Sequence, residues 1–204
     1  MKSGSLQLSP LRFAALADMP EQPWRNGAGR TRELLAWPQA QDWHIRISVA
    51  DIERDAPFSV FAGIDRWFAV ISGRGVRLSD AAATVVLREG AAPWRFDGER
   101  APTCSLLEGP TRDLNLMLRR ERMRGRLEVA YSGLAWVSDA PFRALFSVAP
   151  VTLSCGSAAH PVPAMTLAWT DDAVPNERWV IEPAQAVRGP AWWIEATPHA
   201  AHRP

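Results

Sequence analysis

The sequence of 204 residues has little cysteine, one lysine, one tyrosine and no long apolar run. Two cysteines, Cys104 and Cys155, are too few for a disulfide framework or a thiolate zinc site. Each lies in an apolar stretch, so we expect buried thiols in a reducing, cytoplasmic compartment. No stretch reaches the about 18 apolar residues of a membrane span, and the N-terminus has no apolar secretory core. These absences predict a cytoplasmic protein without a membrane partner.

The charge is also nearly balanced, with 23 basic and 22 acidic residues. A net charge of +1 argues against a chain built as a whole to bind polyanions. Five arginines gather in Arg119–Arg126, but no aromatic residues are interleaved with them. We therefore interpret this cluster as paired with acids inside the protein, and do not expect nucleic acid as a partner. A homodimer is left open by the sequence.

What the chain has in excess is turn residues and tryptophan. Short β-rich runs recur at intervals of roughly ten residues, separated by 17 prolines and 13 glycines, which predicts an all-β fold. Ser72–Gly75 has the glycines of a tight hairpin. We place a boundary near the arginine-rich segment, which divides the chain into residues 1–120 and 121–204. The ten tryptophans must fill a core or line a cavity.

Two of the predicted strands alternate in polarity. In Trp43–Ile52, Arg46 and Ser48 fall on the polar face, and in Asp113–Leu118, Asp113 and Asn115 share one face. In a half-solvated sheet such a face points to water, whereas in a closed barrel it can line a cavity. Periodicity alone leaves both interpretations open.

The segment Pro23–Glu33 is rich in glycine and in polar side chains. Its glycines allow positive φ angles or a close backbone approach, but no βαβ unit surrounds it, so it is not a dinucleotide-binding motif. A ligand-binding loop and a glycine-rich turn with solvated flanks both fit this pattern. Its candidate ligand contacts are Trp24, Asn26, Thr31, Arg32 and Glu33.

Three ordered blocks of the sequence resemble the HutD/Ves family. They are Pro23–Glu33, then Arg46–Ala50 with Asp55–Arg66, and Gly109–Arg120. The resemblance implies a bicupin, in which two small antiparallel, jelly-roll-like β-barrels share one chain. It also implies a ligand pocket in the first barrel and an association with histidine-utilisation operons. The C-terminal half carries no comparable motif.

The chain departs from the family pattern at four positions. Ala28 replaces a usual Gly, Ile45 a Trp, Ala62 a Pro and Leu114 a Phe. We expect these changes to alter the aromatic wall of the pocket.

No metal or other cofactor is expected. Many cupins hold a metal through a His-x-His pair, a Glu and a later His, but the equivalent stretch here reads Phe58–Phe61 followed by Asp65 and Arg66. Phenyl rings and guanidinium groups are not metal ligands. None of the four histidines, His44, His160, His199 and His202, forms a close pair with an acid in sequence.

The polar side chains predict recognition of a small carboxylate. The resemblance implies that it is a metabolite of histidine utilisation such as urocanate or formylglutamate, bound in a regulatory or metabolite-buffering role. Arg46 would bind the carboxylate through two parallel hydrogen bonds, and Glu33 or Asp113 would accept from an N–H group. Arg66 is either a second anion contact or the ion-pair partner of Asp65 or Glu33. The predicted ligand contacts are Trp24, Asn26, Thr31, Arg32, Glu33, Arg46, Ser48, Phe58, Arg66, Asp113 and Asn115.

The alternative is a metal-free cupin enzyme of the isomerase or lyase type. Its acid and base would come from His44, Glu33 and Asp113. The sequence shows no convincing pair of nucleophile and base, so no residue is assigned a catalytic role.

Overall fold

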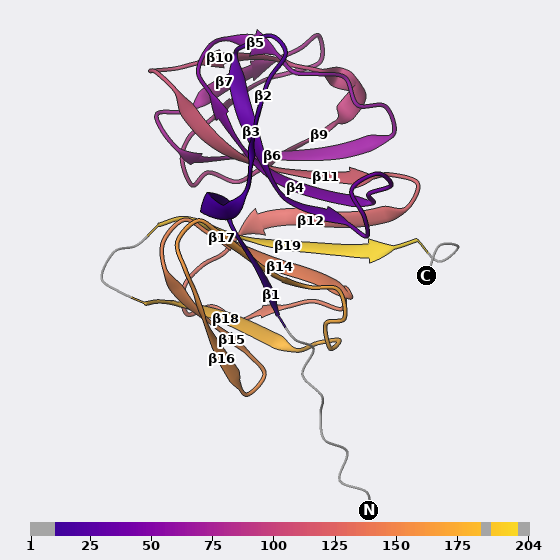
Figure 1. Ribbon diagram of the computed structural model, residues 1–204, viewed down its shortest axis with the longest axis vertical. Helices are drawn as coiled ribbons and strands as arrows, with labels where there is room; N and C mark the ends of the chain where they lie inside the picture. The colour runs from indigo at the N-terminus through magenta and orange to yellow at the C-terminus, as the bar shows by residue number, and fades with distance from the viewer. Residues whose placement is uncertain (1–10, 185–188, 200–204) are drawn as a thin grey trace, which may run out of the picture.

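The computed structural model describes residues 11–184 and 189–199 and shows two antiparallel β-barrels stacked on each other (Figure 1). This arrangement confirms the predicted all-β fold. The predicted features at the first ten residues and at His202 lie outside the described residues. In the described ranges, no helix has the length and apolar character needed to cross a bilayer.

The N-terminal barrel consists of a six-stranded sheet facing a four-stranded sheet. In spatial order the larger sheet contains β2 (Glu21–Pro23), β3 (Gly29–Trp37), β4 (Ile45–Ile52), β11 (Thr111–Arg119), β6 (Ile64–Ser72) and β9 (Trp94–Asp97). The smaller sheet contains β5 (Ala56–Pro57), β10 (Thr103–Leu106), β7 (Val76–Ser79) and β8 (Thr84–Leu87). Two short 3₁₀ helices are η1 (Leu16–Asp18) and η2 (Gly98–Arg100).

The C-terminal barrel pairs a five-stranded with a four-stranded sheet. The larger sheet contains β1 (Arg12–Ala15), β17 (Thr166–Thr170), β14 (Phe142–Ser147), β19 (Ala191–Pro198) and β12 (Met123–Val129). The smaller sheet contains β13 (Trp136–Val137), β18 (Arg178–Pro183), β15 (Val151–Cys155) and β16 (Ala158–Val162).

The first strand crosses the boundary that we placed at residues 120/121. The turn at Arg119–Arg122 does separate β11 of the first barrel from β12 of the second. However, β1 pairs with β17, so a strand from the start of the chain forms the edge of the C-terminal barrel's larger sheet. Strand pairing therefore divides the chain at residue 120 with β1 as an exception.

The described residues form three apolar clusters, and the largest lies between the two barrels. The larger sheets of the two barrels face each other across a cluster that includes Ile47, Leu116, Phe146 and Trp192. We call this cluster the interbarrel core. Smaller clusters fill the N-terminal barrel and the C-terminal barrel. The six-stranded sheet is therefore buried on both faces at its centre.

The interbarrel core decides the direction of the alternating strands. Ile45, Ile47 and Val49 of β4 lie in it, and their polar neighbours Arg46 and Ser48 consequently point into the N-terminal barrel. Of the two interpretations that periodicity left open, the inward orientation of the polar face is confirmed.

Most tryptophans fill cores rather than line a cavity. Trp67, Trp169 and Trp192 belong to the interbarrel core. A second group, Trp136, Trp179 and Trp193, packs inside the C-terminal barrel, where the rings of Trp136 and Trp193 stack 4.9 Å apart.

The glycine turn at Ser72–Gly75 is not the predicted hairpin. Its two flanking strands, β6 and β7, belong to different sheets and do not pair. Gly73 and Gly75 have φ angles of 100° and 107°, and a Cβ atom on either would lie within 2.8 Å of a backbone oxygen. The glycines mark a corner where the chain passes between sheets, because a positive φ specifies a turn but not which strands then pair.

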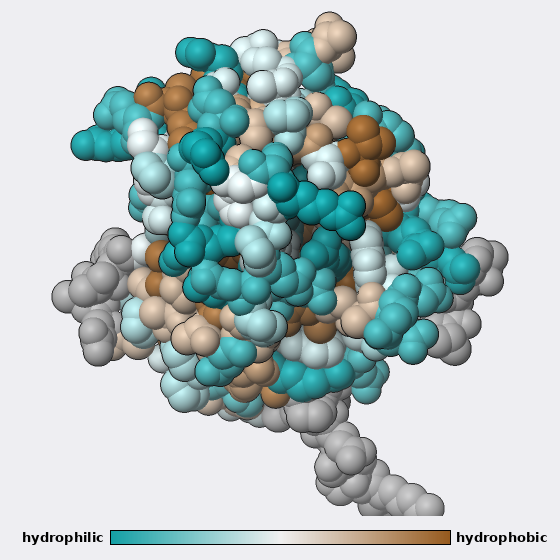
Figure 2. All heavy atoms as spheres, turned by 45° about the horizontal axis from the view of Figure 1, so that its top comes forward, coloured by the Kyte–Doolittle hydropathy of each residue, from teal (hydrophilic) through white to brown (hydrophobic). Residues whose placement is uncertain are grey.

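Both cysteines are buried, as predicted, and neither forms a disulfide. Burial raises the pKa of Cys104 and of Cys155 to about 12, so both remain neutral thiols at physiological pH. Figure 2 shows mostly hydrophilic residues on the face where the N-terminal barrel comes forward.

Removing one side chain from the interbarrel core should destabilise both barrels together. Leu116→Ala is expected to lower the free energy of unfolding by about 2–5 kcal/mol, because Leu116 is fully buried between the barrels. Urea unfolding followed by circular dichroism and by tryptophan fluorescence should give one coincident transition. The control Val86→Ala, at an exposed position on β8, should cost less than about 0.5 kcal/mol. Two separate transitions for Leu116→Ala would contradict the coupling.

Candidate functional site

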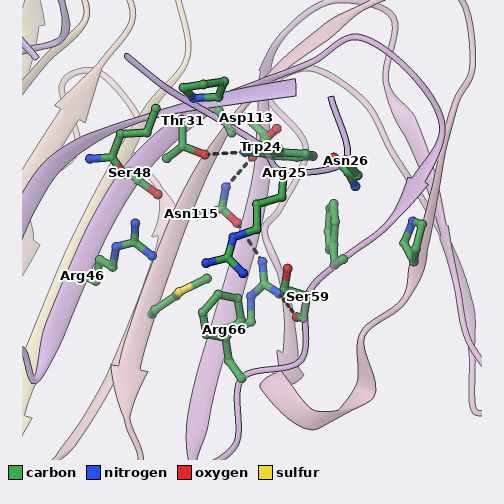
Figure 3. Close-up of a pocket in the computed structure, with 17 residues that line it drawn as sticks. Trp24, Arg25, Asn26, Thr31, Arg46, Ser48, Ser59, Arg66, Asp113 and Asn115 are labelled. Atoms are coloured by element: carbon green, nitrogen blue, oxygen red, sulfur yellow. Dashed lines mark hydrogen bonds between the residues drawn. The ribbon is translucent and has the colours of Figure 1, made fainter. Parts of the chain in front are cut away.

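A cavity of about 640 Å³ opens into the N-terminal barrel (Figure 3). Its floor is formed by β4, β11 and β6, whose registers bring side chains into three rows across the sheet. Each row runs from β4 through β11 to β6. The rows are Arg46, Met117, Arg66; Ser48, Asn115, Phe68; and Ala50, Asp113, Val70.

One wall of the cavity is the turn between β2 and β3. Gly27 has a φ of 65°, and the Asn26 Oδ1 atom accepts a hydrogen bond from the Ala28 N–H at 3.0 Å. Gly29 is required because a Cβ atom there would lie 2.3 Å from the Asp51 carbonyl oxygen. The Trp24 indole N–H donates to Thr31 Oγ1 at 2.7 Å. The segment is therefore a tight turn that also presents side chains to the cavity, so it fits both interpretations drawn from its sequence.

A β-bulge positions Glu33 beside Arg46. The register of β3 against β4 shifts between Glu33 and Leu35, which places Leu34 in the interbarrel core and keeps Glu33 on the cavity side. The Arg46 Nε atom donates to Glu33 Oε2 at 2.6 Å. Glu33 thus orients Arg46, and the terminal nitrogens of this guanidinium face the cavity.

Arg66 lies at the deep end of the floor within an aromatic enclosure. Its guanidinium carbon is 5.2 Å from the ring centres of Phe58 and Phe61 and 5.0 Å from that of Phe96. The terminal nitrogens donate long hydrogen bonds to the Ser59 carbonyl and to Asn115 Oδ1. Arg66 Nε is buried without a hydrogen-bond partner. Burial lowers the pKa of Arg66 to about 10, which leaves it cationic at neutral pH.

Asp113 is the carboxyl group of the cavity floor. Its Oδ2 atom accepts a short hydrogen bond from the Asn115 amide, and its Oδ1 atom is buried with no partner. Burial raises the pKa of Asp113 well above the usual range, against the opposing effects of the Asn115 hydrogen bond and the Arg66 charge. Among the described residues that line the cavity, the buried side-chain atoms without a hydrogen-bond partner are Arg66 Nε and Asp113 Oδ1.

Arg25 lines the cavity although it was not among the predicted contacts. Figure 3 shows its guanidinium reaching across the cavity toward Arg66. Its side chain is exposed, and it forms no ion pair with any residue of the described ranges. One feature of the sequence could have identified Arg25. It stands between Trp24 and Asn26, which are both predicted contacts, in the turn that forms this wall.

Most of the predicted ligand contacts are brought together in this cavity. Two are not among its lining residues. Glu33 lies behind Arg46, and Arg32 is a correction: it pairs in register with Val49 and lies on the opposite face, with ion pairs to Glu21 and Asp51. Adjacent residues of a strand point to opposite faces, so Thr31 and Arg32 cannot both face the cavity. The residues that line it as predicted are Trp24, Asn26, Thr31, Arg46, Ser48, Phe58, Arg66, Asp113 and Asn115.

Of the two alternatives left open for Arg66, the ion pair with Asp65 is not formed. The Asp65 side chain points away from the cavity to Arg95 and Arg120. Ile45 and Leu114, two of the four departures from the family pattern, do not alter the pocket wall because both are fully buried in the interbarrel core. His44, a candidate for the enzyme alternative, packs against Trp37 and is not among the cavity-lining residues.

The donor set does not fit a metal ion. The charged residues lining the cavity are Arg25, Arg46, Arg66 and Asp113, so cationic groups outnumber the single carboxyl group. Cationic guanidinium groups repel a metal ion and have no lone pair to donate. Within the described ranges, no group of three or more His, Cys, Asp or Glu residues is placed to hold one. The arrangement instead suits an anion.

The described part of the C-terminal barrel holds its buried arginine differently. Arg143, which is completely buried, occupies its interior and donates hydrogen bonds to the carbonyl oxygens of Ser138, Ala140, Val174 and Glu177. A cavity beside Trp179 has a volume of only about 20 Å³. Backbone carbonyl groups of the second barrel therefore accept the hydrogen bonds of its buried arginine.

The arginine-rich segment is paired internally, as interpreted from the sequence. Arg119 lies 3.6 Å from Asp42, Arg120 lies 2.8 Å from Asp65, and Arg126 lies 3.0 Å from Glu195. These pairs link the segment to both barrels. The expectation that nucleic acid is not a partner stays a prediction.

The two-barrel architecture defines a cupin-type protein. The same fold occurs in a variant of the oxalate decarboxylase of Bacillus subtilis, with a TM-score of 0.61 over 94% of this chain and 78% of that chain. At 9% sequence identity this likeness concerns the fold alone. Residues 16–177 match the HutD family model, and the chain belongs to the HutD family. Membership links it to histidine utilisation, in agreement with the motifs of its N-terminal half.

Relatives with more similar sequences agree with this assignment. Protein Ves of Citrobacter koseri is 35% identical over 122 residues, which span 59% of this chain and 64% of that protein. An uncharacterised 21.2 kDa protein in the hutC 3' region of Pseudomonas putida is 37% identical over 124 residues, covering 59% of this chain and 65% of that protein. The structure of HutD from Pseudomonas fluorescens SBW25, in a formate condition, has a TM-score of 0.81 at 28% identity, over 94% of this chain and all of that chain.

The raised pKa of Asp113 predicts a specific dependence of stability on pH. Below about pH 4 the carboxyl group is protonated in both the folded and the unfolded chain. As the pH rises further, the unfolded chain releases a proton that the folded chain retains, so stability falls by up to about 1.4 kcal/mol per pH unit until the folded pKa is reached. In urea unfolding, Asp113→Asn should therefore gain stability over the wild type progressively above about pH 4.

Asp80 provides a control of opposite sign. Hydrogen bonds from Arg100 lower the pKa of Asp80 to about 2, so its ionised form contributes stability above about pH 4 that is lost as the pH falls toward 2. Asp80→Asn should be less stable than the wild type at neutral pH. Parallel pH curves for Asp113→Asn and the wild type would contradict the raised pKa.

Proposed function

We propose that this protein binds a small carboxylate, such as urocanate or formylglutamate, in the cavity of its N-terminal barrel, in a regulatory or metabolite-buffering role in histidine utilisation. The observation that supports this function best is the buried Arg66, a cation whose Nε atom has no hydrogen-bond partner. Leaving a buried charged donor unsatisfied is costly, and a bound carboxylate removes this cost.

The remaining features of the cavity favour the same class of ligand. A volume of about 640 Å³ lies within the usual range of small-molecule sites. Arg46 and Arg66 stand in one row of the floor on either side of Met117, and Arg25 approaches from the opposite side. A planar carboxylate matches the two parallel donors of a guanidinium group.

Apolar and uncharged groups complete the recognition surface. The rings of Trp24 and Phe58 both line the cavity and offer apolar surface to a flat ligand. Ser48 and Asn115 form the central row of the floor and supply uncharged hydrogen-bonding groups. This composition favours a ligand that carries a planar apolar part as well as its charge.

A panel of ligands tests the proposal directly. Thermal unfolding should be measured with urocanate, formylglutamate, histidine and glutamate, and a true ligand at 100 times its dissociation constant should stabilise the fold by about 2.7 kcal/mol. Arg46→Ala is expected to weaken binding roughly 10- to 100-fold through the loss of charge-assisted hydrogen bonds. Arg32→Ala is the matched control, because Arg32 lies on the neighbouring strand but on the opposite face. Equal affinity of both variants would reject the role of Arg46, and no response to any of the four compounds would contradict the proposal for them.

Arg25 allows a test of the cavity mouth without a folding defect. Because it is exposed and unpaired within the described ranges, Arg25→Ala should change stability by less than about 0.5 kcal/mol. It should weaken ligand binding and reduce the dependence of affinity on salt, since an exposed charge acts through a screened field. Isothermal titration at low and high ionic strength measures both effects. Arg124→Ala, at an exposed position on β12 of the other barrel, should change neither.

A further inference from the structure

The carboxyl group of Asp113 faces the cavity with one oxygen satisfied and one without a partner. Asn115 donates to Oδ2, while Oδ1 is buried and unpaired. Asp113 is 1% exposed, so bulk water does not solvate the group. Its cross-strand neighbours are apolar, Ala50 on β4 and Val70 on β6. The described residues therefore leave the hydrogen-bonding capacity of Oδ1 unused.

No cation pairs directly with this carboxyl group among the described residues. The nearest guanidinium along the floor is that of Arg66, and it donates to Asn115 Oδ1 at 3.5 Å rather than to Asp113. The Asn115 amide therefore stands between Arg66 and Asp113, accepting from one and donating to the other. A buried carboxylate without a paired cation is costly to ionise.

The other charged groups around the cavity do not make ionisation of Asp113 favourable. Arg66 on β6 favours the ionised carboxylate, and Asp51 on β4 opposes it. Cys104 on β10, which faces Asp113 across the barrel, stays a neutral thiol. Arg46 on β4 is already paired with Glu33. A bound anion adds a further negative charge inside the cavity, which disfavours a second one nearby.

Building on the proposed function, we infer that Asp113 is a neutral carboxylic acid in the ligand-bound cavity and donates a hydrogen bond from Oδ1 to the bound anion. Arg66 Nε donates a second hydrogen bond to the same anion. The proton comes from solvent, so the complex contains the anion together with one proton on Asp113. The ionised form of the free protein consequently binds more weakly than the protonated form.

This inference makes Asp113 a determinant of specificity. A protonated carboxyl group is a hydrogen-bond donor, whereas an ionised one only accepts. The deep end of the cavity then presents two donors, from Asp113 and Arg66, and selects a ligand whose inner end carries acceptors alone. A ligand with an ammonium group at that end would leave both donors unpaired.

The experiment compares the wild type with Asp113→Asn, a neutral variant of nearly the same shape. Formylglutamate is the probe because its carboxyl groups titrate well below neutrality. Between about pH 6 and about pH 9, infrared difference spectra should show a protonated-carboxyl band that is missing in Asp113→Asn. Wild-type affinity should fall by up to about tenfold per pH unit wherever this band titrates in the free protein, with proton uptake detected by calorimetry in two buffers. Asp113→Asn should bind within about threefold of the protonated wild type at every pH.

The control Asp97→Asn neutralises an exposed carboxylate of the same sheet, on β9, and should leave the pH profile unchanged. A band that persists in the complex across the whole pH range, with constant affinity, also supports the inference, because Asp113 is then protonated throughout. Absence of the band from the wild-type complex, or a loss of more than about tenfold in Asp113→Asn, would overturn it. If formylglutamate and the other three compounds all fail to bind, the carboxylate function fails for this panel. In that case the infrared spectrum of the free protein tests the protonation of Asp113 independently. Presence of the protonated-carboxyl band supports a neutral Asp113, and absence of the band overturns the inference.

Discussion

The contact between the two larger sheets is the constraint on which the rest of the structure depends. It buries the apolar faces of β4, β11 and β6 against the C-terminal barrel, so their other faces must point into the N-terminal barrel. Those inward faces carry Arg46, Asp113 and Arg66. Burial of hydrocarbon between the barrels thus holds charged groups inside one of them, at a cost that the apolar contact offsets.

The two barrels handle a buried arginine in different ways. In the C-terminal barrel, four backbone carbonyl groups accept hydrogen bonds from Arg143, and the interior is filled. In the N-terminal barrel, Arg66 donates only two long hydrogen bonds and is surrounded by phenyl rings, and its Nε atom has no hydrogen-bond partner. The first arginine has a structural role, whereas the second is a ligand contact under the proposed function. One fold, used twice, thus holds a buried arginine with backbone acceptors in one barrel and without them in the other.

The family motifs map onto the parts of the N-terminal barrel that shape the cavity. The first block builds the turn around Gly27 and Gly29, and the later blocks build the floor and the wall that carries Phe58. Alternation in β4 and β11 made the inward residues predictable once a closed barrel was assumed. Arg25 was missed although it stands between two predicted contacts, because a turn lacks the regular alternation that tells which side chains of a strand share a face.

The sequence by itself determined the all-β class, the residue types of the site and the approximate positions of its strands, because turn residues and period-two alternation are local signals. Only the tertiary structure decided which face of each strand looks inward, that Arg32 faces away while Arg25 faces the cavity, and that β1 joins the second barrel. These outcomes depend on contacts between residues far apart in the chain. A local pattern does not contain them, since the same alternation serves a sheet facing water and a sheet facing a cavity.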